Sequence, residues 1–230
     1  MHKDIKVVAF DADDTLWVNE PYFQQIEQHF CSLLSSYAPA EEISRQLLQT
    51  QIRNLPLYGY GVKCFILCMI ETAGRITDHN ATMHLTNEVI QLGQELLEKP
   101  IELLEGVEEL LAELHGRYML VVATKGDLLD QQRKLVKSGI QEHFHHIEIM
   151  SNKQPGNYQK ILDHLSCKPE HFLMLGNSVK SDIIPVLELN AYAAHIPFHT
   201  TWAHEMHDET PQHGNFIQLE RISDILAYLG

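Results

Sequence analysis

The sequence predicts an α/β fold, with a parallel sheet and a helical domain inserted after the first strand. Five apolar residues, Val7 to Phe10 with Ile5 just before them, are typical of a short strand buried on both faces. Between Trp17 and Pro100 the apolar residues recur at helical spacing, and no strand pattern interrupts them. From Gly106 onward helical and strand patterns alternate, which indicates parallel βα units.

The inserted block contains four expected helices. The first begins near Asn19 and Pro21, carries its apolar positions from Phe23 to Tyr37, and ends before Pro39. The others cover about residues 41–53, 61–73 and 81–98, and Pro56, Gly59 and Gly61 interrupt the pattern between the second and the third. The chain is therefore expected to divide into an α/β core domain, residues 1–17 and 100–230, and a helical domain, residues 18–99.

The second half of the chain supplies the rest of the expected sheet. Strands are predicted at residues 118–123, 147–150, 172–175 and 191–196. Helices are predicted at residues 107–114, 128–137, 158–165 and 183–189, and a final helix near residues 221–229. Residues 197–214 are rich in histidine and other polar side chains, so we expect a loop there.

Composition and charge exclude several classes of protein. Apolar residues make up 44% of the 230 residues, which is enough for a packed core and argues against a disordered chain. The formal charge of −14 repels nucleic acid and anionic membranes, so we expect neither as a partner. No apolar run has the length of a membrane span, and the first residues show no signal-peptide core. We therefore expect a cytoplasmic protein, while its oligomeric state stays open.

The four cysteines show no disulfide framework. They are Cys31, Cys64, Cys68 and Cys167. Cys64 and Cys68 are four residues apart and would share one face of a helix. Because two further ligands at metal spacing are missing, buried thiols are favoured over a metal site.

Three carboxylates and a threonine follow the first strand directly. Residues two apart on an extended backbone project to the same side, so Asp11 and Asp13 leave the strand together. Two carboxylates about 4 Å apart repel by roughly 4 kcal/mol at an effective dielectric of about 20. A fold keeps such a pair when a cation or a raised pKa offsets the repulsion. Because open α/β sheets bind ligands beyond the carboxyl ends of their strands, this stretch indicates a metal-assisted carboxylate site.

Two other interpretations of this stretch remain open. The first is a solvated turn in which an aspartate caps the next helix. The second is a calcium loop, which fits less well because no glycine-containing acidic loop between two helices follows.

Polar residues also follow three of the later strands. They are Thr124 with Lys125 and Gly126, then Lys153, and then Asn177 with Asp182. Each is weak evidence alone, because threonine often caps a helix and lysine is usually a surface residue. Together with the stretch from Asp11 to Thr15, they make four motifs in order, each at the end of an expected strand. This set is a much more specific signal than any one motif alone.

These four motifs resemble those of the haloacid dehalogenase-like (HAD) hydrolases. The matching residues are Asp11, Asp13 and Thr15 in the first, Thr124 in the second, Lys153, Pro155 and Tyr158 in the third, and Gly176 and Asp182 in the fourth. The resemblance implies a Rossmann-like parallel sheet core over residues 1–17 and 100–230. It also implies that residues 18–99 form a helical C1-type cap, which would open and close over the active site and exclude water.

The resemblance implies the roles of the site residues. Asp11 would be the nucleophile, and Asp13 would protonate the leaving oxygen and then activate water. The phosphoryl group would be bound by Thr124, Lys125, Gly126 and Lys153. At Lys125 this chain departs from the small polar residue that is common in the family, which leaves the role of Lys125 open.

A magnesium ion is the cofactor that the resemblance implies. Its ligands would be Asp11, the backbone carbonyl of Asp13, and Asn177 or Asp182. Asn177 stands where the family usually has an acidic residue, so this ligand supplies an oxygen without a charge. Metal affinity is therefore expected to be lower than in relatives with an acid there.

Three functions are compatible with these residues. A magnesium-dependent phosphatase acting on a small phosphorylated metabolite accounts for both Asp11 and Asp13. A 2-haloacid dehalogenase would use the same nucleophile on carbon without Mg²⁺, but such relatives usually carry an aromatic residue in place of Asp13. A non-catalytic phospho-ligand-binding protein on the same scaffold is the third, and the retained set of motif residues argues against it.

Two further groups are candidates without a fixed role. Five histidines, His195, His199, His204, His207 and His213, could form a second metal site, although a solvated loop is the simpler interpretation. In the helical block, Tyr58, Tyr60 and Lys63 are candidate substrate contacts. Trp17 could line a substrate cavity or simply pack in the core.

Overall fold

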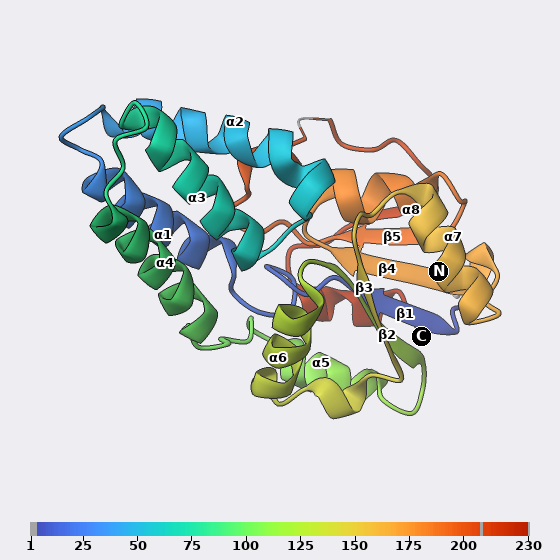
Figure 1. Cartoon of the computed structure of the whole chain (residues 1–230). Helices are drawn as coiled ribbons and strands as arrows, with labels where there is room; N and C mark the ends of the chain where they lie inside the picture. The colour runs from blue at the N-terminus through green and yellow to red at the C-terminus, as the bar shows by residue number, and fades with distance from the viewer. Residues whose placement is uncertain (1–3, 208, 230) are drawn as a thin grey trace. The chain divides into compact units, whose positions relative to one another are not determined.

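The computed structural model describes residues 4–207 and 209–229 (Figure 1). The chain divides into two compact units. One is an α/β unit formed by the described parts of Met1–Glu20, Ile101–Lys125 and Gln131–Gly230, and the other is a helical unit formed by Pro21–Pro100 and Gly126–Asp130. The sequence did not indicate that Gly126–Asp130, from the second half of the chain, would join the helical unit.

The α/β unit contains a six-stranded parallel sheet with the order β3-β2-β1-β4-β5-β6. Its strands are β1 (Val7–Phe10), β2 (Met119–Lys125), β3 (His146–Met150), β4 (Phe172–Gly176), β5 (Tyr192–His195) and β6 (Phe216–Gln218). The predicted α/β class and the Rossmann-like parallel sheet are confirmed. Only the three-residue β6 had no counterpart in the sequence prediction, because its pattern is too short to distinguish from a loop.

Side chains of β1 alternate between the two faces of the sheet, and both faces are buried. Val8 and Phe10 belong to a core that includes residues of the helix Val107–Leu114, α5. Val7 and Ala9 belong to a second core that includes residues of the helix Pro155–His164, α7. A strand covered by helices on both sides has no polar face, which explains the continuous apolar run in the sequence.

The remaining helices of the α/β unit connect successive strands. Besides α5 and α7 they are α6 (Leu128–Ser138), which starts in the helical unit, and α8 (Ile184–Leu187). Short 3₁₀ helices are η1 (Gln141–His143), η2 (Pro169–His171), η4 (Ala203–Glu205) and η5 (Ile222–Ala227), and η3 (Val179–Ile183) is a π-helical turn.

Two predictions in this unit need correction. The helix expected at residues 183–189 is only α8, preceded by the π-helical turn η3. The final helix expected near residues 221–229 is the 3₁₀ helix η5. At its start the Asp224 carboxylate accepts a hydrogen bond from the backbone N–H of Arg221, which stabilises a tight turn there.

Besides the start of α6, the helical unit contains four helices and no strand within its described residues. They are α1 (Glu20–Leu33), α2 (Ala40–Tyr58), α3 (Val62–Ile76) and α4 (Met83–Glu98). Pro56 does not end α2 as the sequence indicated, because the helix continues to Tyr58. A proline in the last turn removes only one hydrogen bond, and Gly59, with φ 71°, then ends the helix by donating to the Leu55 carbonyl.

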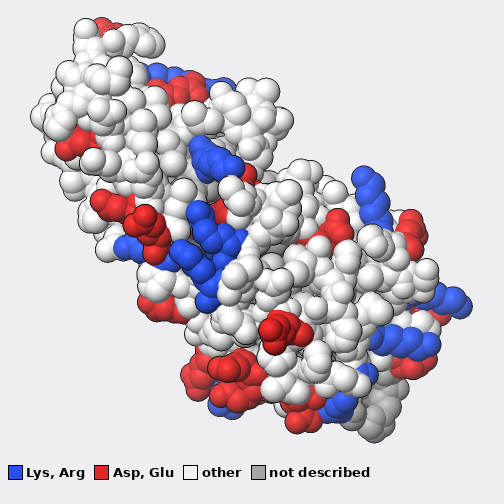
Figure 2. Space-filling view, turned by 60° about the horizontal axis from the view of Figure 1, so that its bottom comes forward, with Lys and Arg blue, Asp and Glu red and all other residues white. Residues whose placement is uncertain are grey.

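All four cysteines are free thiols, and three of them are buried in the helical unit. The sulfurs of Cys64 and Cys68 lie 3.9 Å apart on one face of α3, as the spacing predicted. Figure 2 shows basic and acidic side chains interspersed over the face in view, although the chain carries a formal charge of −14. Among the described residues, no helix combines the length and the apolar character that a membrane span requires.

Candidate active site

The register of the sheet brings the ends of three neighbouring strands together. Phe10 of β1 is level with Val122 of β2 on one side and with Leu175 of β4 on the other. The backbone N–H of Asp11 still donates to the Leu175 carbonyl, at 2.9 Å. Asp11 therefore leaves the sheet between the ends of β2 and β4, at the edge where parallel sheets bind their ligands.

A buried lysine joins two buried carboxylates at this edge. The Nζ atom of Lys153, in the loop between β3 and α7, lies 2.5 Å from Oδ1 of Asp11 and 2.5 Å from Oδ1 of Asp182. The Lys153 and Asp182 side chains are each only 1% exposed, and that of Asp11 is 10% exposed. Three residues predicted from separate motifs thus form one ionic cluster with two negative groups and one positive group.

Burial and charge act against each other within this cluster. Burial raises the pKa of Asp11 to about 7; the Lys153 ammonium opposes this rise and the Asp182 carboxylate adds to it. Burial would lower the pKa of Lys153, but the two carboxylates outweigh that effect and raise it above its ordinary value. Lys153 is therefore a permanent positive charge beside the Asp11 carboxylate.

Thr15 connects Asp11 to Asn177. Its hydroxyl oxygen lies 3.3 Å from Oδ2 of Asp11 and 3.3 Å from Oδ1 of Asn177, and it accepts the Asn177 backbone N–H at 3.1 Å. The side-chain amide oxygen of Asn177 is thereby held on the same side as the Asp11 carboxylate. The sequence placed Thr15 in the first motif but did not assign it this role.

Three donors fix the Asp13 carboxylate. The indole N–H of Trp17 donates to Oδ1 at 2.7 Å, and Nζ of Lys134 lies 2.9 Å from the same oxygen. The side-chain amide of Gln131 donates to Oδ2 at 2.8 Å and to the Lys125 carbonyl at 2.8 Å. Lys134 and Gln131 were not predicted, and Trp17 is a fully buried core residue that also orients Asp13.

Asp14 has the capping role that was the alternative interpretation of this stretch. Its carboxylate accepts the backbone N–H groups of Asn19, at 2.8 Å, and of Glu20, the first residue of α1, at 3.0 Å. Burial raises the pKa of Asp14 to about 7, and these two N–H groups oppose the rise. The first motif therefore contains both a helix cap and a buried site carboxylate.

The residues predicted to bind phosphate at the end of β2 have different surroundings. Thr124 is buried, with its hydroxyl 3.5 Å from the amide nitrogen of Gln131, which also contacts Asp13. The Lys125 ammonium lies 2.7 Å from Glu205 and 2.8 Å from the hydroxyl of Ser181. Gly126 directly follows β2 and belongs to the helical unit.

Glu205 is the central residue of a network that the sequence did not reveal. Besides Lys125, it accepts hydrogen bonds from the hydroxyls of Ser178, at 2.6 Å, and Ser181, at 2.5 Å. Both serines belong to the fourth motif, between Asn177 and Asp182. Glu205 thus ties the loop that follows β5 to the segment carrying the expected metal ligands.

The other candidates have contacts of their own. Lys63 forms an ion pair with Asp127 at 2.9 Å within the helical unit, and the side chain of Tyr58 is half exposed. Among the histidines, Nε2 of His195 lies 3.0 Å from the backbone carbonyl oxygen of Asn177, and the His204 ring lies beside the Lys180 ammonium. Within residues 4–207 and 209–229, no group of three potential metal ligands includes any of the five histidines for which a solvated loop was the simpler interpretation.

The donor atoms at the strand ends fit a magnesium ion. Asp11 and Asp182 supply carboxylate oxygens and Asn177 supplies an amide oxygen, and all three are ligands that Mg²⁺ accepts. Lys153 balances only one of the two buried carboxylates, so ionisation of both leaves one negative charge uncompensated at a buried position. A divalent cation would offset that charge.

Comparison with known proteins identifies the family. The family model described as haloacid dehalogenase-like hydrolase matches residues 5–186, most of the chain. The chain belongs to the haloacid dehalogenase-like hydrolases. It is therefore an enzyme of the hydrolase class, as the four motifs predicted.

Solved structures agree with this assignment to the HAD-like hydrolases. A haloacid dehalogenase-like family hydrolase from Xanthomonas campestris is 33% identical, with 98% of this chain and 91% of that chain covered and a TM-score of 0.87. The putative HAD-hydrolase YfnB from Bacillus subtilis, bound to magnesium, is 16% identical, with 99% and 100% covered and a TM-score of 0.68. A dehalogenase with an intermediate complex is 13% identical, with 100% and 99% covered and a TM-score of 0.70. Among curated proteins, none matches the chain.

Gly176 is required for the position of Asp182 in this HAD-like hydrolase. A Cβ atom at residue 176 would lie 2.3 Å from Cγ of Asp182, a distance that forces the carboxylate to move. We expect Gly176→Ala to destabilise the fold by about 1–3 kcal/mol and to abolish most activity. Thermal unfolding and hydrolysis rates test this. Gly156→Ala in α7 is the matched control, because its Cβ meets nothing within 4 Å, and unchanged activity in both variants would contradict the expectation.

Glu205 should stabilise the fold in a pH-dependent way. Burial alone would raise its pKa, but Lys125 and the two serine hydroxyls outweigh burial and lower the pKa to about 2. A lowered carboxyl pKa gives stability that is present above the ordinary value of 4.5 and is lost as pH falls toward 2.

We therefore expect Glu205→Gln to lower the free energy of unfolding at pH 7 by about 3 kcal/mol. This value follows from the fall of the Glu205 pKa from 4.5 to about 2, because a change of one pKa unit corresponds to about 1.36 kcal/mol. The difference from wild type should shrink between about pH 4.5 and pH 2. Denaturant unfolding across this range measures it. The exposed Glu170→Gln, which removes a surface pair with Lys168, should change stability by less than about 1 kcal/mol. Equal effects of the two variants would refute the buried network.

Proposed function

We propose that this HAD-like hydrolase is a magnesium-dependent phosphatase that cleaves a small phosphate monoester through an aspartyl-phosphate. The observation that carries the proposal is the pair of carboxylates after β1. Asp11 lies against Lys153 at the strand end, and Asp13, two residues later, is held by Trp17, Lys134 and Gln131. A nucleophile followed by a second carboxylate supplies both functions that ester hydrolysis needs.

Asp11 and Asp13 divide the two chemical steps. In the first, a carboxylate oxygen of Asp11 forms a bond to phosphorus as the ester P–O bond breaks, and Asp13 donates its proton to the leaving alkoxide. In the second, Asp13 removes a proton from water as the water oxygen attacks phosphorus, and the P–O bond to Asp11 breaks. Inorganic phosphate leaves, and both carboxylates return to their starting states.

Lys153 and Thr124 bind the phosphoryl oxygens in this proposal. The Lys153 ammonium, held at Asp11, supplies a fixed positive charge where negative charge develops. The backbone N–H groups of Lys125, the last residue of β2, and of Gly126, which follows it, are the further proposed donors. Because the Lys125 ammonium is engaged by Glu205, we propose that its side chain positions the fourth motif instead of contacting phosphate.

Asp11, Asp182, Asn177 and the backbone carbonyl of Asp13 would hold the magnesium ion. The ion would neutralise phosphoryl charge and orient the ester. Because Asn177 is neutral, activity should require a rather high Mg²⁺ concentration, and Asn177→Asp should lower the concentration that gives half-maximal activity. An unchanged requirement in this variant would remove Asn177 from the ligand set.

A 2-haloacid dehalogenase remains the second candidate, because a dehalogenase shares the fold and Asn177 is present. It would use Asp11 on carbon and would need neither Mg²⁺ nor Asp13. A non-catalytic phospho-ligand-binding role is the third, and the buried Asp11–Lys153–Asp182 cluster supports catalysis over it.

A panel of substrates distinguishes the candidates. The purified protein is assayed with phosphorylated metabolites, a folded phosphoprotein and 2-chloroalkanoates, each with Mg²⁺ and with excess chelator. We expect phosphate release from small soluble metabolites only with Mg²⁺, since the helical unit is proposed to act as a cap. Chloride release without metal would establish the dehalogenase, and efficient action on the phosphoprotein alone would refute the cap. No turnover on any substrate would support the binding protein.

A further inference from the structure

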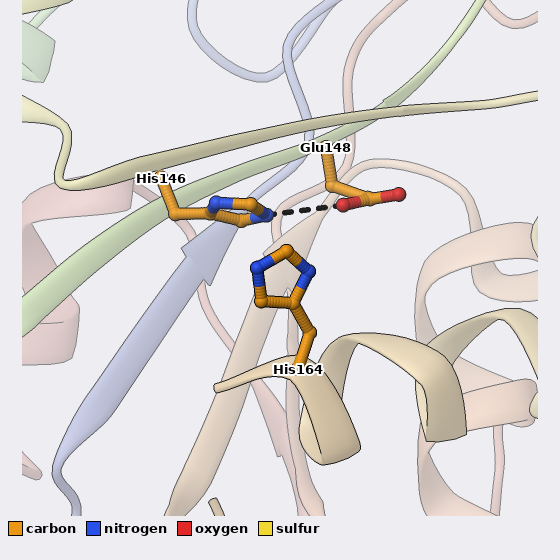
Figure 3. A group of neighbouring side chains, drawn as sticks. All are labelled: His146, Glu148 and His164. Atoms are coloured by element: carbon orange, nitrogen blue, oxygen red, sulfur yellow. Dashed lines mark hydrogen bonds and ion pairs between the residues drawn. The ribbon is translucent and has the colours of Figure 1, made fainter. Parts of the chain in front are cut away.

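A second group of potential metal ligands lies on β3 and α7, the two elements that flank the loop carrying Lys153. His146 and Glu148 are two residues apart on β3 and project to the same side of this edge strand. His164 is the last residue of α7, and its ring points toward the other two side chains (Figure 3). His146 is level with Val121 near the start of the β2–β3 pairing, so the group is separate from the site at the strand ends.

The three side chains are close enough to share one ion. Nε2 of His146 lies 3.0 Å from Oε2 of Glu148, and the centroids of the His146 and His164 rings are 4.7 Å apart. One ligand atom from each residue lies within 4.8 Å of the others. Metal–ligand bonds of about 2.0–2.1 Å at tetrahedral angles place ligand atoms about 3.3 Å apart. Small rotations of the exposed His164 and the half-buried pair would reach this spacing.

The donor types indicate which metal would bind. Two imidazole nitrogens and one carboxylate oxygen form a set that suits Zn²⁺ and related transition metals, whereas Mg²⁺ and Ca²⁺ prefer oxygen ligands. A surface ion pair between His146 and Glu148 would not by itself place a second imidazole against the first. Within residues 4–207 and 209–229, this is the one such group of three.

We propose that His146, Glu148 and His164 form a site for one Zn²⁺ ion, with water as the fourth ligand. The ion closes the segment from His146 to His164, which contains β3, the loop carrying Lys153, and α7. Because it binds only when this segment is folded, Zn²⁺ stabilises the supports on both sides of Lys153.

Zinc titration of the chelator-treated full chain tests this site. Saturating Mg²⁺ is kept present to compete for the strand-end carboxylates, and binding is followed by calorimetry and by thermal unfolding. We expect one equivalent of tightly bound Zn²⁺ and a rise in Tm. His164→Ala and Glu148→Gln should each weaken binding by at least about 100-fold and abolish the rise in Tm, because each removes one of three ligands.

His84→Ala is the matched control. His84 and Glu88 form a comparable exposed pair on α4 without a third ligand, so this variant should keep the wild-type zinc affinity. Equal zinc binding by wild type, His164→Ala and Glu148→Gln would overturn the proposal. So would the absence of any zinc-induced rise in the Tm of the wild type.

Discussion

Replacing Asp11 with asparagine should lower the hydrolysis rate by at least about 10⁴-fold, as is typical when a nucleophile is removed. The amide cannot form the covalent intermediate, and the effect should fall on kcat at saturating substrate. Asparagine has nearly the same shape and leaves Lys153 paired with Asp182. The fold should therefore remain, with a Tm within about 4 °C of wild type, which corresponds to about 1 kcal/mol for a chain of this size.

Steady-state kinetics and thermal unfolding check the Asp11→Asn expectation together. Asp163→Asn, an exposed carboxylate on α7 in the same unit, is the control and should keep full activity. Turnover by Asp11→Asn within tenfold of wild type, after deamidation has been excluded by mass, would disprove the nucleophile assignment.

Replacing Asp13 with alanine should affect the two chemical steps differently. A sugar or alkyl alkoxide needs a proton to leave, whereas nitrophenolate does not, and water needs a base in either case. General acid–base assistance is typically worth about 10²–10⁴-fold, or very roughly 3–5 kcal/mol. With p-nitrophenyl phosphate the variant should release a burst of nitrophenol near one equivalent per site and then turn over slowly. With a sugar phosphate both steps should be slow.

Rapid-quench kinetics with saturating Mg²⁺ measure the Asp13→Ala burst. The site should survive the substitution, because Lys134 still contacts Asn19 and Gln131 still contacts the Lys125 carbonyl. Lys134→Met is the control: it removes the ion pair with Asp13 but keeps the carboxylate, so it should show no burst. Unchanged rates of Asp13→Ala on both substrates would remove Asp13 from the mechanism and favour the dehalogenase or binding-protein alternatives.

The central cluster could be predicted from the sequence because each member follows a strand. Asp11, Lys153 and Asp182 come after β1, β3 and β4, and parallel strands bring their carboxyl ends to one edge of the sheet. The apolar runs predicted the ends of those strands to within one or two residues. Knowing the strands was therefore enough to expect these side chains to meet.

The residues around Asp13 and Asn177 could not be predicted in the same way. Gln131 and Lys134 lie on α6, more than a hundred residues from Asp13, and Glu205 comes from a loop without a periodic pattern. Their contacts depend on how a helix and a loop pack against the strand ends, and no local spacing encodes that. The sequence did show that Gln131 and Lys134, three residues apart on α6, share one face of that helix, but not which residue that face contacts.

Local sequence rules also misjudged two chain segments. Pro56 was expected to interrupt a helix, but a proline in a final turn sacrifices only one hydrogen bond, and α2 continues past it. The apolar residues near 221–229 have helical spacing, yet they form the 3₁₀ helix η5, whose Ile222 and Ile225 belong to the core of the sheet. Tertiary packing decided between the two helix types there.

Trapping the covalent intermediate tests the proposed phosphatase mechanism most directly. The wild-type protein is mixed with Mg²⁺ and the best phosphate monoester from the substrate panel, quenched in acid within milliseconds, and digested for peptide mass analysis. The account predicts one phosphoryl group on Asp11, formed and lost at rates that match turnover, and none in Asp11→Asn. Turnover without a phosphorylated Asp11, or an alkyl ester on Asp11 after incubation with a 2-chloroalkanoate, would contradict it.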